Sequence, residues 1–170
     1  HLPLPYDRVS MAFSRGRPEG GVAAAEALES LLQIHDPATV AAVIIEPVTG
    51  TNGILVLPDA YLRGVRDLCD KYGIVMIADE VMSGFGRTGS WFSWQHPAVN
   101  PDGIVPDLIT FAKGVNSGYV PAGGVVISES ISGSFDDQVF PGGLTYSGHP
   151  LAMASIVASI DAMEEEGIIE

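Results

Sequence analysis

The two lysines of this 170-residue chain are the residues best suited to covalent chemistry, and their settings differ. Lys71 follows Asp70 near the end of an expected amphipathic helix, where the helix dipole favours a solvated lysine. Lys113 follows the apolar run 108–112 and precedes Gly114, so its amine enters a tight turn at a strand end. Burial there would disfavour the ammonium form and free the amine as a nucleophile toward carbonyl groups. The alternative is a lysine that extends from the strand end into water.

A carboxylate follows another apolar strand in the same way. Asp79 comes directly after residues 74–78, so it is pushed toward the interior, where a carboxylate needs a partner. Arg87 is one candidate, and such a pair would be purely structural. A cofactor with a protonated ring nitrogen is the other, because an aspartate stabilises that charged form. Both interpretations remain open on these residues alone.

Two glycine-rich segments suit close approach to a ligand. Residues 84–89 spell the dinucleotide-binding pattern G-x-G-x-x-G, but no helix-forming sequence follows and no acidic residue ends a second strand at the required distance. We interpret them as a loop whose backbone can approach a site. Thr145, within 142–148, precedes an expected helix, where hydroxyls and free N–H groups suit an anion such as phosphate. An ordinary helix-capping cluster explains the same residues equally well.

The remaining residue inventory disfavours several other chemistries. The four histidines share no ligand spacing and Cys69 is the only cysteine, so neither a metal site nor an intramolecular disulfide is expected. The G-x-S-x-G turn of serine hydrolases does not occur. A net charge of -13, with only eight scattered basic residues, argues against nucleic-acid binding. The expected partner is a small molecule, whose anionic groups must be held locally by backbone N–H groups and a few cations.

Alternating helices and strands must position these residues. Helices are expected at 22–34, 61–73 and 150–166, the first with Ala24, Leu28, Leu31 and Leu32 on its apolar face. Apolar runs predict strands buried on both faces at 41–45, 74–78, 107–111 and 123–127. The sequence therefore predicts an α/β fold with a mostly parallel sheet flanked by helices. Sites in such sheets form outside the carboxyl ends of the strands, where Glu46, Asp79 and Lys113 stand.

The composition as a whole is that of one globular domain, with 46% hydrophobic residues. Neither a long apolar stretch nor a signal peptide is present, so we expect no membrane span and a cytoplasmic location. Residues 1–20 are rich in proline and glycine and look like a connecting segment. The chain starts without methionine and ends without a polar tail, so we expect a fragment of a longer protein.

Four motifs in a fixed order form the most specific feature of the sequence. They are IIEPVTGTNG at 44–53, IVMIADEVMSGFGRTG at 74–89, PDLITFAKGVNSGYVPAGG at 106–124, and GGLTYSGHP at 142–150. Together they resemble the class III, or omega, aminotransferases among the fold type I pyridoxal-phosphate enzymes. The resemblance covers about residues 40–166, and it implies that 1–170 is an internal part of the cofactor-binding large domain.

The resemblance assigns roles to five residues. It implies that Lys113 forms the Schiff base with pyridoxal 5′-phosphate, that Asp79 holds the pyridine nitrogen, and that Val81 packs on one face of the ring. Thr145 matches the family threonine that reaches the cofactor phosphate of the neighbouring subunit, which requires a homodimer with a shared site. Glu46 matches a glutamate near the site with a supporting role.

The implied activity is transfer of an amino group to a keto acid such as pyruvate or 2-oxoglutarate. Family members acting on ornithine or 4-aminobutyrate carry a second glutamate in EP-x-x-GE and a glutamine after DEV, where this chain has Thr51 and Met82. These differences favour amine, beta-amino acid, taurine-like or omega-amino donors. The expected phosphate-binding loop and carboxylate-binding arginine lie outside the chain, so the fragment alone is expected to be inactive and the donor stays open. The alternatives are an aminomutase of the same family and a nucleotide-binding α/β module.

Overall fold

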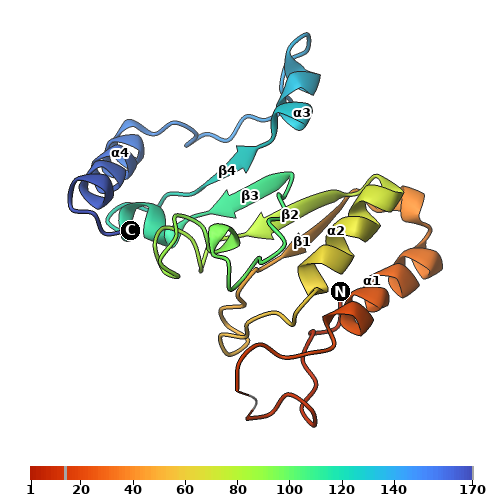
Figure 1. Cartoon of the computed structure of the whole chain (residues 1–170). Coiled ribbons are helices and arrows are strands. Elements are labelled where there is room, and N and C mark those ends of the chain that lie inside the picture. The colour runs from red at the N-terminus through yellow and green to blue at the C-terminus, as the bar shows by residue number, and fades with distance from the viewer. Residues whose placement is uncertain (14, 170) are drawn as a thin grey trace.

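A computed structural model describes residues 1–13 and 15–169. Helices and strands alternate from α1 to β2, after which two more strands and two helices follow (Figure 1). The elements are α1 Gly21–His35, β1 Ala42–Ile45, α2 Tyr61–Tyr72, β2 Val75–Asp79, β3 Leu108–Phe111, β4 Gly124–Ile127, α3 Glu129–Ser132 and α4 Pro150–Glu165. Four short 3-10 helices are η1 Pro37–Thr39, η2 Ser93–Gln95, η3 Lys113–Asn116 and η4 Gly133–Phe135. The expected helices and strands are all present, with ends shifted by one or two residues at most.

The four strands form one sheet in the order β1-β2-β3-β4. β1 pairs with β2 and β2 with β3 in parallel, whereas β4 runs antiparallel to β3. This arrangement confirms the predicted α/β fold with a mostly parallel sheet. Because β1, β2 and β3 run the same way, their carboxyl ends meet at one edge of the sheet, where Ile45 pairs with Ala78 and Asp79 pairs with Thr110.

The core lies between this sheet and the helices α1 and α2, which lie side by side in Figure 1. Val65 and Cys69 of α2 and Met76 of β2 are fully buried, and Leu28 and Leu32 of α1 pack into the same cluster. Burial of each such side chain contributes about 1.5–3 kcal/mol. As expected, α2 stops at Gly73, whose φ of 67° lets its N–H donate to the carbonyl oxygen of Cys69. This packing fixes the strands that carry the polar residues.

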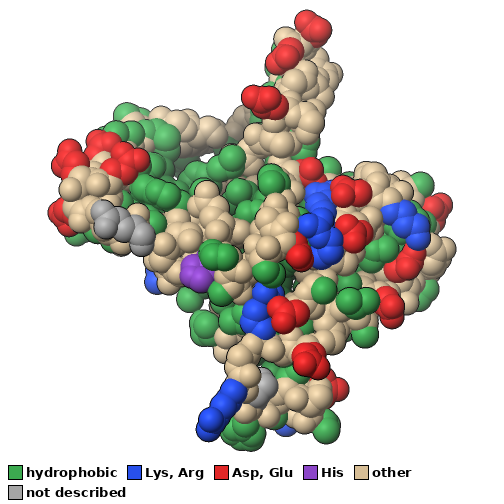
Figure 2. Space-filling view, viewed as in Figure 1, with side chains coloured by type: hydrophobic (Ala, Val, Ile, Leu, Met, Phe, Trp, Pro, Cys, Tyr) green, Lys and Arg blue, Asp and Glu red, His purple; other side chains and the backbone are tan. Residues whose placement is uncertain are grey.

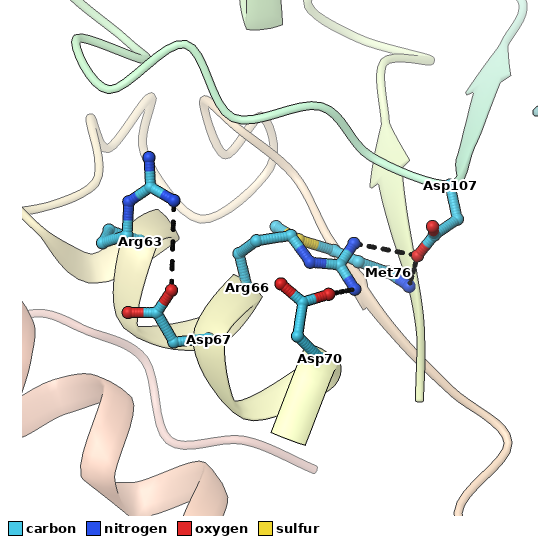
Figure 3. Close-up of polar contacts among 6 residues, drawn as sticks. All are labelled: Arg63, Arg66, Asp67, Asp70, Met76 and Asp107. Carbon is cyan, nitrogen blue, oxygen red and sulfur yellow. Dashed lines mark hydrogen bonds and ion pairs between the residues drawn. The ribbon is translucent and has the colours of Figure 1, made fainter. Parts of the chain in front are cut away.

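An arginine on α2 ties that helix to the start of β3 (Figure 3). The Arg66 guanidinium bonds Asp70 at 2.8 Å and Asp107 at 2.9 Å. The same Asp107 oxygen accepts the Met76 backbone N–H at 2.7 Å, so it also ties the residue before β3 to β2. Arg66 is mostly buried, and charge-assisted bonds of this kind hold a geometry firmly. The network sets where β3 begins, and therefore where the chain leaves β3 toward Lys113.

Two expectations about burial were wrong. The strands are not covered on both faces, because α1 and α2 both pack on one side; Ile44 of β1 stays 57% exposed, and Val125, Val126 and Ile127 of β4 are exposed as well. Figure 2 shows apolar side chains gathered over this part of the sheet. On α1 the buried alanine is Ala25 rather than the expected Ala24, and Leu31 is only half-buried. Within the described residues, no helix combines the length and apolar content that crossing a bilayer requires.

Candidate active site at the carboxyl edge of the sheet

The structure brings three of the predicted residues to the same edge of the sheet. Glu46 directly follows β1, Asp79 is the last residue of β2, and Lys113 follows β3 after one intervening residue. Asp79 lies opposite Thr110, three residues before Lys113 along the chain. The parallel register therefore gathers an amine and two carboxylates where α/β sheets hold their ligands.

Asp79 is half-buried and has no cationic partner in the described part of the chain. Its Oδ1 accepts the Val81 backbone N–H at 3.0 Å and the Thr110 hydroxyl at 3.2 Å. Arg87, the candidate structural partner, is exposed, and no ion pair joins it to Asp79 in the described residues. Two neutral donors orient the carboxylate without neutralising it. A positively charged ligand atom, such as a protonated ring nitrogen, fits this carboxylate.

Lys113 is exposed, so the expectation that it is buried was wrong for this chain. The turn after Phe111 places Lys113 at a φ of 39°, in the left-handed region, and the backbone continues from Lys113 into η3. A non-glycine residue holds such a conformation at a cost of about 1–3 kcal/mol, supported by its surroundings. Lys113 lines an open depression of about 560 Å³ together with Arg87, Ser117 and Met163.

Glu46 stabilises the loop after β1, which approaches the loop after β2 at Gly50. Its Oε2 accepts the Gly50 backbone N–H at 2.7 Å. A Cβ on Gly50 would lie 2.7 Å from Cγ of Met82, so only glycine allows this close approach. Thr51 and Met82, the two positions that depart from the ornithine and 4-aminobutyrate subgroup, thus stand in neighbouring loops beside the site.

Thr145 lies apart from these residues along the chain, in a turn before α4. The threonine is exposed, like every residue from 136 to 151. The N-cap of α4 is His149, and no side chain caps the helix, so the capping interpretation of this segment receives no support. In the described residues the Thr145 hydroxyl makes no hydrogen bond within the chain. Its proposed contact with a neighbouring subunit stays a prediction.

The glycine loop at 84–89 does not open a helix. Gly86 donates its backbone N–H to Ser90 at 3.1 Å, and Gly89 donates to Gly86 at 3.0 Å, so the segment folds back as consecutive turns. Only the three-residue helix η2 follows. The dinucleotide pattern therefore lacks the helix N-terminus that would bind a pyrophosphate. The loop instead packs against the turn that carries Lys113, as a Cβ on Gly114 would lie 3.0 Å from the Gly84 carbonyl oxygen.

Lys71 and Cys69 have structural roles. The Lys71 ammonium pairs with Glu29 of α1, and this hydrogen bond holds the pKa of Lys71 above its ordinary value. Burial raises the pKa of the Cys69 thiol to about 11, which keeps it protonated and unreactive. Across residues 1–13 and 15–169, no group of three or more His, Cys, Asp or Glu side chains could hold a metal ion.

Sequence reasoning missed Glu80, which is fully buried. Its carboxylate accepts hydrogen bonds from Ser83, Ser93 and Trp94. The alternation along β2 could have revealed this burial. Every second residue of a strand faces the same side, and Glu80 follows Met76 and Ala78, which are buried in the core. Asp79 has the opposite parity, so the two adjacent acids face different surroundings.

An α/β sheet with an unneutralised aspartate and a conformationally constrained lysine at its carboxyl edge has the arrangement that small-molecule sites at strand ends use. The profile of the class-III aminotransferases matches residues 3–170, and the chain belongs to that family. This confirms the resemblance and extends it to nearly the whole chain.

Named relatives and solved structures agree with this assignment. The omega-amino acid–pyruvate aminotransferase of Pseudomonas putida is 40% identical over 100% of this chain and 38% of its own length. The taurine–pyruvate aminotransferase of Bilophila wadsworthia is 39% identical over 88% of the chain and 33% of its own. The taurine:2-oxoglutarate aminotransferase of Bifidobacterium kashiwanohense, solved with PLP and glutamate, superposes with a TM-score of 0.80 at 51% identity, over 86% of this chain and 32% of that one. The chain thus spans about a third of the length of these relatives.

Proposed function

We propose that the full-length protein is a pyridoxal 5′-phosphate-dependent aminotransferase. It moves an amino group from an amine, beta-amino acid, taurine-like or omega-amino donor to a keto acid such as pyruvate or 2-oxoglutarate. The observation that carries this proposal is the Asp79 carboxylate, oriented by two neutral donors, without a cation in the described residues, and at the same sheet edge as Lys113. A site built for a cationic ring and an amine-reactive carbonyl needs this pair.

The residues of this chain divide the work of the reaction. The cofactor supplies a carbonyl group that amines can join and a ring that accepts electrons. Lys113 would hold the cofactor covalently through its amine, and the same amine, once free, would take the proton from the carbon that bears the donor nitrogen. Asp79 would hold a proton on the ring nitrogen. The donor would leave as a carbonyl compound whose oxygen comes from water, and the keto acid would take up the amino group and release a water molecule in return.

Three further residues have supporting roles in the proposal. Val81, whose N–H is already bonded to Asp79, packs on one face of the ring. Glu46 supports the loop beside Met82 through Gly50. Thr145, on a fully exposed segment, reaches the cofactor phosphate of a second subunit in a homodimer. The cytoplasmic location stays a prediction.

The donor class follows from the two loops beside the site. Thr51 and Met82 replace the glutamate and glutamine of the ornithine and 4-aminobutyrate subgroup. Relatives named for omega-amino acids, beta-alanine, putrescine and taurine all use pyruvate. We therefore infer that these two positions favour amine, beta-amino acid, taurine-like or omega-amino donors over ornithine and 4-aminobutyrate.

The test uses the full-length protein loaded with pyridoxal phosphate. Beta-alanine, taurine and putrescine are offered with pyruvate or 2-oxoglutarate, and formation of alanine or glutamate is measured. Borohydride reduction and peptide mapping then locate the cofactor label, which we expect on Lys113. An amine rearrangement that needs no keto acid would identify the aminomutase alternative. A protein that binds a dinucleotide but takes no label would identify the nucleotide-binding module.

A further inference from the structure

Glu80 is a buried carboxylate that is satisfied entirely by neutral donors. Its side chain is 0% exposed. Oε1 accepts the Trp94 backbone N–H at 2.7 Å, and Oε2 accepts the Ser93 N–H at 3.1 Å and the hydroxyls of Ser93 and Ser83, each at 2.7 Å. Burying a carboxylate is costly without such bonds. Four donors converging on one side chain indicate that the local structure is organised around it.

These bonds close the loop that runs from Glu80 to Trp94. The Gly84 N–H donates to the Glu80 carbonyl oxygen at 2.9 Å at the near end, while Ser93 and Trp94 are held at the far end. The Glu80 backbone N–H donates to Thr110 at 2.9 Å, and the Thr110 hydroxyl bonds Asp79. Glu80 is therefore connected both to the loop and to the strand pair that carries Asp79.

The loop that Glu80 closes is the surface against which the Lys113 turn packs. A Cβ on Gly114 would lie 3.0 Å from both the Gly84 carbonyl oxygen and Cβ of Phe85. The Phe85 ring packs on Phe92 and Phe111, with centroids 5.4 and 5.5 Å apart, and Phe111 ends β3 just before the turn. Lys113 has a left-handed backbone, a conformation that a non-glycine residue keeps only where its surroundings hold it, and the packing around Phe85 surrounds this turn.

The geometry points to Glu80 as a positioning residue that fixes the Lys113 amine relative to Asp79 through the loop 81–94. Glu80 touches neither residue through its carboxylate, so it acts only through the loop. The inference rests on the proposed function, because it gives Lys113 a reacting partner whose position matters.

The substitution Glu80→Gln replaces one oxygen of the carboxylate by an NH2 group and keeps the length of the side chain. The two backbone N–H groups bond different oxygens, Trp94 to Oε1 and Ser93 to Oε2. Either orientation of a glutamine amide therefore points its NH2 group at one of these N–H groups, and one buried donor loses its partner. The side-chain volume is unchanged, so the loop loosens without a cavity being created.

The experiment compares full-length E80Q, loaded with pyridoxal phosphate, with the parent. We expect kcat to fall about 10-fold or more while KM for the donor changes less than about twofold, because the donor-binding walls are untouched. As a readout independent of turnover, the pH midpoint of the visible band of the lysine-bound cofactor should shift by about half a unit or more. Glu29→Gln, which removes a surface pair of α1, is the matched control and should leave both measurements at parent values.

The outcomes separate this inference from the proposed function. A parent protein without the band or amino transfer would overturn the proposed function itself. A parent with both, and an E80Q variant whose melting temperature falls while kcat, KM and the band midpoint match the parent, would overturn the positioning role alone. If E80Q does not fold, Ser93→Ala removes one hydroxyl donor and keeps both backbone N–H groups. It should move the band midpoint in the same direction by a smaller amount, and an unchanged midpoint would contradict the inference.

Discussion

Replacement of Asp79 by asparagine should separate the charge of this side chain from its part in the fold. The carboxylate accepts from Val81 at 3.0 Å and from Thr110 at 3.2 Å through the same oxygen, and an asparagine oxygen can accept both. In the described residues no hydrogen bond ends on the second oxygen, so an NH2 group there displaces no donor. We expect the free energy of unfolding of D79N, without cofactor, to stay within about 0.5 kcal/mol of the parent.

The catalytic rate should respond much more strongly than stability. A carboxylate paired with a protonated ring nitrogen forms a charge-assisted hydrogen bond, and a neutral amide can neither match its strength nor hold the proton on the ring. A loss of about 2 kcal/mol in the transition state corresponds to about a 30-fold lower kcat. Covalent attachment of the cofactor to Lys113 should survive, because the amine is unchanged.

The assay measures kcat of full-length D79N with saturating cofactor, donor and keto acid, beside thermal unfolding of the same preparation. Thr110→Val is the matched control, since it removes one neutral donor from Asp79 but keeps the charge. It should lower kcat by less than about 10-fold. A D79N variant as active as the parent, or one whose rate falls only in step with its stability, would refute the assignment of Asp79 to the ring nitrogen.

Three further predictions follow from the described contacts. Lys113→Ala should abolish amino transfer and the borohydride-fixed label, whereas Lys71→Ala, which removes only an exposed pair, should change the rate less than about twofold. Thr145→Ala should raise the cofactor dissociation constant about 10-fold in a titration. Cys69 should resist iodoacetamide until the protein unfolds. Its raised pKa also contributes stability that is complete below about pH 9 and lost as pH rises to about 11, so Cys69→Ala should flatten that loss in unfolding measurements.

The order and type of the helices and strands could be predicted because their apolar periods are local. Which faces of the sheet are covered by other elements could not be predicted. A continuous apolar run fits any strand that is buried in the complete protein, and it does not show which part of the chain covers each face, so the exposure of Ile44 was missed. The antiparallel direction of β4 could not be predicted either, because a run of apolar residues does not show which way its strand points in the sheet. On α1, Ala24 and Ala25 are equivalent by type, and only the position of α2 decides which one is buried.

The site was predictable to the extent that it depends on strand ends. Asp79 and Glu46 directly follow apolar runs, and parallel pairing then places them at one edge. The conformation of Lys113 was not predictable from its neighbours. Its left-handed φ arises where Gly114 approaches Gly84, a contact between segments 30 residues apart. The burial of Glu80 could have been predicted from the alternation along β2, but its hydrogen-bond donors could not, because they come from a loop whose return path the sequence does not reveal.

Because Lys113 is exposed, other parts of the protein would have to cover it and complete the substrate site. An amine that reacts with carbonyl compounds must be shielded from bulk water during the reaction, and the described residues leave it at the rim of an open depression. On the proposed function, the remaining walls of the site would come from parts of the full-length protein outside this chain or from a second subunit. The apolar residues exposed on β4 and on the segment before α4, among them Val126 and Leu144, offer the surface on which such walls can pack. On the proposed function, Thr51 and Met82 border one side of the donor, so we expect substitutions at these two positions to shift the relative rates with beta-alanine, taurine and putrescine without abolishing amino transfer.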